Sequence, residues 1–265
     1  MSDPIAPLIE NLHAQGRLRV WSLVITAFGD LFQHRGGAVS SGRLGRLLGR
    51  VGVEQGTMRT AMSRLGQDGW VSSERRGRLS LYRLSQEGLD TFAPATARIY
   101  AAPRRAPVAE WALAATLTGG APELRLTPAD EAGPADLLVT GQLARLSDAW
   151  RATLLPEAHR AALDGLACDL RALHTTVISD PLDAAAARML LIHRWRRIVL
   201  RYADLPPELM PADTPLAEPR RQVAETYARI APLAETWLDT AEDDPDRLPQ
   251  ADGRFALRFR GPQQA

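Results

Sequence analysis

The sequence predicts a mainly α-helical protein with a small β content, of the α+β class. Apolar residues recur at three- and four-residue spacing from residue 17 to 65 and again from about 143 to 240, which indicates amphipathic helices. Short β-prone runs beside glycine or proline lie at 70–84 and 111–140. With 45% hydrophobic and 24% charged residues, the composition is that of an ordinary globular chain.

The front of the chain is expected to contain a tail, residues 1–16, and then two helices. The first helix is predicted over 17–31 and ends before Gly36 and Gly37, because paired glycines supply the backbone freedom that a helix terminus needs. Ser40 or Ser41 is a suitable cap for a second, short helix that ends at Gly52.

A third helix is predicted from residue 53, because Met58, Met62 and Leu65 fall on one helical face. The β-prone runs 70–75 and 80–84 follow it and flank Gly77, which permits the tight turn of a hairpin. Ser85 is expected to cap a fourth helix that extends toward residue 100. Pro94 is the point at which this helix would break or bend.

The rest of the chain divides into a middle section, a helical section and a tail. Residues 102–142 are expected to form a linker and a small middle α/β element, with strands near 111–117, 124–126 and 137–140. Residues 143–240 are expected to form a helical C-terminal domain. Residues 241–265 are interpreted as a C-terminal tail, in which 254–260 suits either an edge strand or a solvated segment.

Positive charge is concentrated in the front of the chain. All 32 basic residues are arginine, and residues 1–105 hold 15 of them against 8 acidic residues, a net charge of +7, whereas residues 106–265 carry −6. An asymmetry of this kind is typical of a segment that binds a polyanion.

Three helices followed by a two-stranded wing are the pattern of the winged helix-turn-helix, whose third helix enters the DNA major groove. We therefore interpret residues 17–101 as a DNA-binding domain for duplex DNA.

Two groups of side chains are predicted to contact DNA. On the third helix, the positions that packing does not require are Gln55, Thr57, Arg59, Thr60, Ser63 and Arg64. Arg59 is the best base-reading candidate, because arginine can bond bidentately to guanine. The arginines of the wing are expected to contact phosphates or the minor groove: Arg75, Arg76, Arg78 and Arg83. The alternative interpretation, a solvated face, is less favoured because the motif and the charge coincide.

Two separated stretches of the sequence resemble the PaaX-like repressors of phenylacetate catabolism. The first comprises VITAFGD at 24–30, RGG at 35–37, MRTAMSRL at 58–65, DGW at 68–70 and RIY at 98–100. The second comprises LIHRWRR at 191–197 and LPPELMP at 205–211. The resemblance implies a homodimer that binds a palindromic promoter operator and is released by an aryl-CoA thioester, typically phenylacetyl-CoA. It also implies that the helical domain at 143–240 serves effector binding and dimerisation. Family members usually carry a ferredoxin-like middle domain related to Cas2. In this chain about 40 residues stand in place of that domain.

The second stretch supplies candidates for effector binding: His193, Arg194, Trp195 and Arg197. Guanidinium groups could bind the phosphates of CoA, and an aromatic face could stack on the ligand. The alternative is that Trp195 belongs to the core and that the arginines pair with carboxylates such as Asp204 or Glu208. The sequence leaves both interpretations open.

Other classes of function find less support in the sequence. We expect no catalytic residues, no metal site and no cofactor, because the chain has no Gly-rich phosphate loop, nucleophile elbow or histidine pair at metal spacing. A Cas2-like nuclease is one alternative, but Thr118-Gly119-Gly120 stands where such enzymes place a metal-binding aspartate. A winged-helix regulator that senses a different ligand or a partner protein is another alternative.

Without a long apolar run or a secretory signal, the chain is expected to be cytoplasmic and to have no membrane contact.

Overall fold

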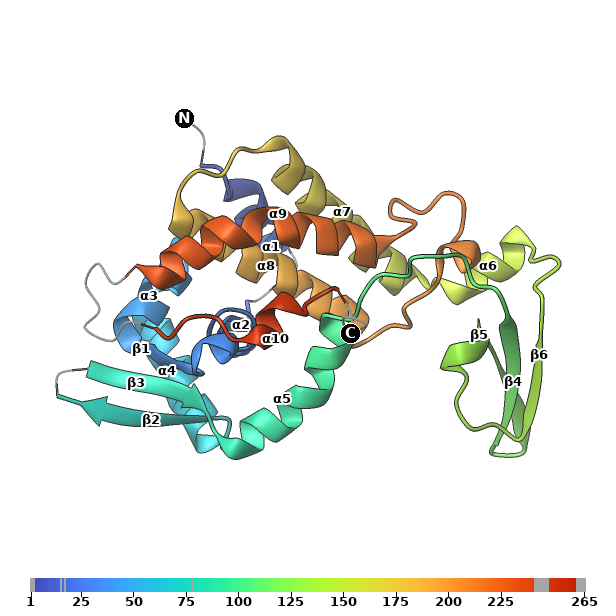
Figure 1. Cartoon of the computed structure of the whole chain (residues 1–265), viewed down its shortest axis with the longest axis horizontal. Helices are drawn as coiled ribbons and strands as arrows, with labels where there is room; N and C mark the ends of the chain where they lie inside the picture. Colours follow the sequence, from blue (N-terminus) through green and yellow to red (C-terminus); the bar gives the residue numbers. More distant parts are fainter. Residues whose placement is uncertain (1–2, 15, 17, 78, 241–247, 261–265) are drawn as a thin grey trace.

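The computed structural model describes residues 3–14, 16, 18–77, 79–240 and 248–260. It contains a body of packed helices with a β-hairpin at one side and, at the opposite end, a separate small sheet (Figure 1). The mainly helical α+β prediction is therefore confirmed.

The first described residues form a packed helix instead of the expected tail. Helix α1 (Ala6–Ala14) lies against α7 (Glu157–Thr175) and α8 (Pro181–Val199). Ile5, Leu8 and Leu12 are buried, and Asn11 donates a hydrogen bond of 2.9 Å to the carboxylate of Asp169. The spacing of these three apolar residues already indicates one helical face, so the interpretation of 1–16 as a tail is corrected.

The first helix of the front section changes its geometry before it ends. Helix α2 (Val20–Ala27) continues into a π-helical turn, η1 (Phe28–Phe32), and a 3-10 turn, η2 (Gln33–Arg35). Gly36 then has a φ of +79°, a conformation that favours glycine, and the predicted helix end is confirmed. The π turn carries Asp30 into the protein interior, where it is fully buried.

Two further helices follow after a short strand, β1 (Ala38–Ser40). The side chain of Ser40 accepts a hydrogen bond from the Arg43 amide at 3.1 Å and caps α3 (Ser41–Arg50), as predicted. Helix α4 (Gln55–Gln67) buries Met58, Met62 and Leu65, which are the core residues that the sequence predicts for it.

The hairpin consists of β2 (Val71–Arg76) and β3 (Leu79–Leu84), and β1 pairs with the other edge of β3 to give the antiparallel order β1-β3-β2. Ser85 caps α5 (Gln86–Ile99) by accepting a hydrogen bond from the Gly88 amide at 3.0 Å. Pro94 lies inside α5 and does not end it. Helix α5 therefore connects the hairpin to the middle of the chain without interruption.

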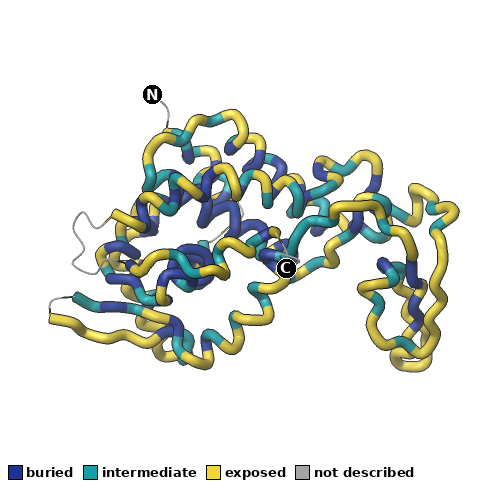
Figure 2. The backbone as a smooth tube through the Cα atoms, viewed as in Figure 1, coloured by how far each residue is buried: buried dark blue, intermediate teal, exposed yellow. Residues whose placement is uncertain are grey.

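The middle section is a β structure instead of the expected α/β element. Its strands are β4 (Trp111–Thr118), β5 (Ala121–Pro128) and β6 (Leu137–Gly141), in the antiparallel order β5-β4-β6. All three predicted strands are thus confirmed, but the only helical piece in their described connections is the 3-10 turn η3 (Ala129–Glu131). The sheet stands apart from the helical body, and most of it is exposed (Figure 2).

Helices α7 and α9 (Pro219–Asp239) pack around α8 and build the core, with a 3-10 turn, η4 (Pro207–Leu209), between α8 and α9. Helix α6 (Asp148–Leu154) precedes them and buries none of its residues. Every residue of α8 from 184 to 195 is buried, and one apolar cluster joins it to α1–α4 and α9. Among the described helices, none is both long and apolar enough to cross a membrane.

The end of the chain returns to this core. A short helix, α10 (Gly253–Ala256), precedes Arg258 and Phe259, whose side chains are buried. For residues 248–260 the expectation of a tail or edge strand is therefore corrected, whereas 241–247 and 261–265 lie outside the described residues. Arg258 is inserted between aromatic rings, with its guanidinium 4.3 Å from the centre of the Tyr100 ring and 5.4 Å from that of the Phe255 ring.

Candidate nucleic-acid interface

Helix α4 presents one polar face to solvent. Its exposed residues include every one that the sequence predicts for DNA contact: Gln55, Thr57, Arg59, Thr60, Ser63 and Arg64. The apolar residues at 58, 62 and 65 fix this orientation, because they turn the opposite face into the core. Arg59 is loosely held, with one hydrogen bond of 3.2 Å to the Gln55 side chain, and Arg64 lies 3.9 Å from Asp68. Both guanidinium groups are therefore accessible to a polyanion.

The start of α4 is a further feature of this surface, and the sequence analysis missed it. Glu54 occupies the N-cap position but accepts no hydrogen bond from the helix with its side chain. The first amide groups of α4 therefore remain available to an acceptor from outside, and the helix dipole favours a negative charge there. The signal in the sequence is a glutamate where a short capping side chain would be usual.

The hairpin beside α4 carries arginines on both of its faces. Strand pairing places Arg76, Glu74 and Arg83 on one face, where Glu74 lies 3.1 Å from Arg76 and 3.5 Å from Arg83. Arg75 points to the other face and donates a long hydrogen bond, 3.4 Å, to the Gly77 carbonyl. Arg75, Arg76 and Arg83 are all exposed, as predicted, whereas Arg78 lies outside the described residues.

The hairpin is fixed to the C-terminal end of α4. The amide of Trp70 donates to the Leu65 carbonyl at 2.9 Å, and the Ser85 amide donates to the Trp70 carbonyl at 2.9 Å. A Cβ at Gly88 would lie 2.5 Å from that same carbonyl, so only glycine permits this close approach of α5. The helix α4 and the hairpin therefore form one surface with a fixed relative position.

A buried charge network connects this surface with the C-terminal helices. The Asp30 carboxylate accepts from Tyr100 at 2.7 Å, Tyr227 at 3.0 Å and Arg258 at 3.1 Å through one oxygen, and from Arg188 at 2.9 Å through the other. These donors come from the end of α5, from α9, from the C-terminal segment and from α8. Asp30 therefore joins four parts of the chain at one point.

The charges within this network keep both buried carboxylates ionised. Burial would raise the pKa of Asp30, but the positive charges of Arg188 and Arg258 outweigh it and lower the pKa below its ordinary value. The same balance lowers the pKa of Glu235, whose oxygens accept from His34, Arg35 and Arg188. Burial in turn lowers the pKa of His34, which favours its neutral form.

Helix α3 is joined to the far end of α9. Arg43 is buried and donates to the carbonyls of Trp237 at 3.0 Å, Leu238 at 3.2 Å and Thr240. Trp237 and Leu238 belong to the last turn of α9 and Thr240 is its C-cap residue, and a cation is favoured at this end of the helix dipole. The front helices and α9 are thus linked at α3 as well as at Asp30.

The predicted effector residues do not line a site together, and this expectation is corrected. Trp195 is buried and donates from its indole nitrogen to the Ile99 carbonyl at 2.9 Å, while Arg194 is paired with Asp169. His193 is buried with its Nδ1 2.9 Å from the Thr26 hydroxyl. Only Arg197 is exposed. The alternative interpretation is therefore correct for Trp195, and for Arg194 the carboxylate partner is Asp169.

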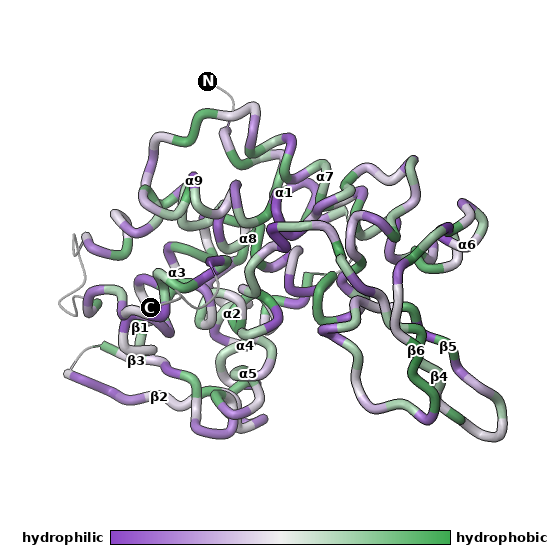
Figure 3. Tube along the Cα trace, turned by 45° about the vertical axis from the view of Figure 1, so that its right-hand side comes forward, coloured by the Kyte–Doolittle hydropathy of each residue, from purple (hydrophilic) through white to green (hydrophobic). Residues whose placement is uncertain are grey.

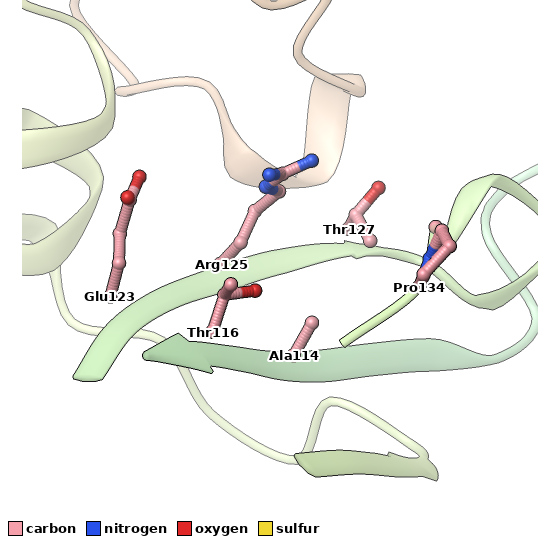
Figure 4. A pocket seen from close by; sticks show the side chains of 7 residues that line it. Ala114, Thr116, Glu123, Arg125, Thr127 and Pro134 are labelled. Carbon is pink, nitrogen blue, oxygen red and sulfur yellow. The ribbon is translucent and has the colours of Figure 1, made fainter. Parts of the chain in front are cut away.

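Two recesses lie near the middle section instead. One, of about 90 Å³, is on the sheet, where Thr116, Arg125 and Thr127 rise from β4 and β5 on the same face (Figure 4). The other, of about 140 Å³, lies where the linker after α5 meets the first turn of α9. In the part of the chain that the structure describes, no group of histidine, cysteine and acidic side chains is arranged to hold a metal ion.

The structure thus defines a mainly helical protein whose exposed helix and adjoining hairpin form an arginine-bearing surface. The chain belongs to the family of PaaX-like proteins. The model of the PaaX-like protein matches residues 19–88, from α2 to the start of α5, and the model of its C-terminal domain matches 150–240, from α6 to the end of α9. The chain is also 28% identical over 285 aligned positions to the transcriptional repressor PaaX of Escherichia coli K12, over 91% of this chain and 90% of that one.

Proposed function

We propose that this protein is a transcriptional repressor that binds duplex DNA through a winged helix-turn-helix. The observation that carries the proposal is the polar face of α4, which is fully exposed and lies next to a hairpin with arginines. In this arrangement α4 enters the major groove and the hairpin contacts the backbone or the minor groove. The name of the similar Escherichia coli protein, a transcriptional repressor, supports the same function.

The two sets of arginines have different roles in this proposal. Arg59 and Arg64, with the polar side chains of α4, reach base edges, and a bidentate arginine–guanine pair specifies sequence. Arg75, Arg76 and Arg83 bind phosphates, which gives affinity for any duplex. A phosphate would also displace Glu74 from Arg76 and Arg83, since an exposed ion pair stabilises by less than about 1 kcal/mol.

We expect Arg59→Ala to abolish sequence preference, with a loss of about 1–3 kcal/mol on the specific site, because a bidentate base contact disappears. Arg76→Ala is the matched control and should weaken specific and random duplexes equally. The measurement is an electrophoretic mobility shift with the promoter of the protein's own gene and a random duplex of equal length, at several salt concentrations. Affinity should fall steeply with salt, because phosphate contacts release counterions. Equal losses on both duplexes for Arg59→Ala would contradict its role.

We further propose that the protein is a homodimer and that the sheet of the middle section forms the interface. One face of this sheet carries large exposed aliphatic side chains: Leu113 at 40%, Leu117 at 64%, Leu124 at 56%, Leu137 at 59% and Val139 at 54%. The strand registers place them together, with Leu113 opposite Val139 and Leu124 and Leu137 both opposite Ala115. Figure 3 shows the same hydrophobic character along β4–β6. A contiguous exposed apolar patch of this kind marks a surface for association.

A second copy of the chain is the occupant that suits this face. The two faces of the sheet differ, because Glu123, Arg125 and Thr127 all lie on the opposite one (Figure 4). An apolar face of three twisted strands is self-complementary, and two such sheets pack face to face at about 10 Å. A two-fold pair would also present two copies of α4 to a palindromic operator, which is the usual geometry of such DNA-binding proteins.

We expect the double variant Leu124→Asp/Val139→Asp to be monomeric, because two charges on each sheet would be desolvated in the interface. Leu138→Asp is the control, since Leu138 is 48% exposed but lies on the opposite face of the same strand. Size-exclusion chromatography with light scattering should give twice 29.0 kDa for the wild type and the control, and 29.0 kDa for the double variant. A monomeric wild type at micromolar concentration would disprove this interface.

Finally, we propose that an aryl-CoA thioester such as phenylacetyl-CoA releases the protein from its operator. The membership of the chain in the PaaX-like family supports this class of ligand. Because His193, Arg194 and Trp195 are buried, an exposed recess elsewhere in the molecule is the better-supported candidate for the effector site.

A further inference from the structure

The recess at the first turn of α9 has the composition of a binding site for an organic anion. It measures about 140 Å³ and is lined by residues of the linker, of η3, of the loop before η4 and of α9. Alanine, leucine and proline side chains, among them Pro103, Leu205 and Pro219, provide apolar walls. Arg104, Arg220 and Arg221 bring three guanidinium groups to the recess, and Glu131, Asp204 and Glu218 bring three carboxylates, each of which is ion-paired with one of these arginines.

The carboxylates that are ion-paired with these arginines are groups that a ligand anion can replace. Arg220 lies 2.6 Å from Asp204, and Arg221 lies 2.9 Å from Glu218. Both carboxylates are more than a third exposed, whereas the Arg220 side chain is only 11% exposed, so a ligand anion can approach each ion pair from its carboxylate side. A phosphate or carboxylate can bond bidentately to a guanidinium, and the positive end of the α9 dipole lies in the same turn.

Arg220 also holds the end of α5. Its Nη1 donates to the carbonyls of Arg98 at 3.0 Å and of Ala101 at 3.2 Å, and its guanidinium lies 5.1 Å from the centre of the Trp195 ring. Helix α5 begins directly after β3 of the hairpin. Arg220 therefore connects the recess, through one continuous helix, with the proposed DNA-binding surface.

We propose that this recess is the effector site and that Arg220 is the residue through which the effector acts. This inference rests on the proposed function and adds to it a location and a mechanical link. The ligand is an anion, bearing phosphate or carboxylate, with an apolar group that lies against the proline walls. It draws Arg220 and Arg221 away from Asp204, Glu218 and the carbonyls of Arg98 and Ala101, so that the end of α5 loses two of its hydrogen bonds and α5 can shift together with the hairpin at its other end.

The test is a calorimetric titration of the full-length protein without DNA. The probes are phenylacetyl-CoA, CoA, phenylacetate and inorganic phosphate, which separate the phosphate source from the carboxylate source. We expect Arg221→Gln to weaken the binding of phenylacetyl-CoA about tenfold to a hundredfold, because a charge-assisted hydrogen bond is lost. Arg105→Gln is the matched control: it removes the same charge from the exposed linker, outside the lining of the recess. Its binding should equal that of the wild type.

A second measurement tests the link to α5. Arg220→Gln should weaken the same probe and should also reduce DNA affinity without any ligand, whereas Arg105→Gln should change neither. The proposed site is wrong if none of the four probes binds. It is also wrong if Arg220→Gln and Arg221→Gln both bind the probe with wild-type affinity. Because the titration contains no DNA, a protein that binds the probe but retards no promoter would disprove the repressor function and leave the site standing.

Discussion

Asp30→Asn is expected to lower the free energy of unfolding by about 3–5 kcal/mol, which is the range for breaking a buried ion pair. Both oxygens of Asp30 accept hydrogen bonds, one from two tyrosines and Arg258 and the other from Arg188. Whichever way the asparagine amide is oriented, its NH₂ group faces a donor. Two buried arginines also lose the charge that compensates them. Urea denaturation at pH 7.5 measures the change.

Asp68→Asn is the matched control for this prediction. It makes the same chemical change in a pair with Arg64, in which the side chains are 58% and 77% exposed and 3.9 Å apart. An exposed pair of this kind stabilises by less than about 1 kcal/mol, so Asp68→Asn should leave the urea midpoint almost unchanged. If Asp30→Asn is also neutral, the carboxylate is not a junction between the front helices and the rest of the molecule.

Stability is expected to fall between pH 7.5 and 5.0, and His193 should account for about 2 kcal/mol of this loss. Burial, with the charges of Arg196, Arg197 and Arg194, lowers the pKa of His193 from 6.5 to about 3. The folded protein therefore keeps His193 neutral, whereas the unfolded chain takes up a proton below pH 6.5. Because the unfolded state binds more protons, acidification in this window favours unfolding.

The variant His193→Gln isolates this contribution, because glutamine keeps a polar group near Thr26 but does not titrate. The free energy of unfolding of this variant should change by about 2 kcal/mol less than that of the wild type over the same pH window. His34 and His159 also have lowered pKa values, but they contribute equally to the pH dependence of both proteins. Asp30 and Glu235 have lowered pKa values and lose their contribution only below about pH 4, outside this window. Parallel pH profiles of the two proteins would show that His193 is not desolvated.

Local patterns in the sequence were sufficient to predict the helices and the hairpin in the front of the molecule. The caps at Ser40 and Ser85, the helix face of Met58 and Met62, and the hairpin about Gly77 all depend on neighbours a few residues away. Such signals survive in a single sequence because backbone geometry alone determines them. For the same reason the exposed face of α4 could be predicted residue by residue.

The sequence analysis failed where contacts are long-range. The partner of Arg258 is Asp30, 228 residues away, so the segment around Arg258 could not be distinguished from a tail. For the basic cluster at 193–197 the sequence left a ligand site and a structural role both open, because the distant partners of Arg194 and Trp195 cannot be identified from it. The run of apolar residues from 184 to 192 was the available signal: a helix that is apolar on all sides is buried, and its polar side chains then need internal partners.

The insertion of Arg258 beside Asp30 has a consequence for biosynthesis. Asp30 leaves the ribosome 228 residues before the arginine that helps to neutralise it, and Arg188 follows it by 158 residues. Domains generally fold from the N-terminus as they emerge. The Asp30 carboxylate therefore lacks its Arg258 partner during most of translation. The buried network around Asp30 is complete only after residue 258 has left the ribosome.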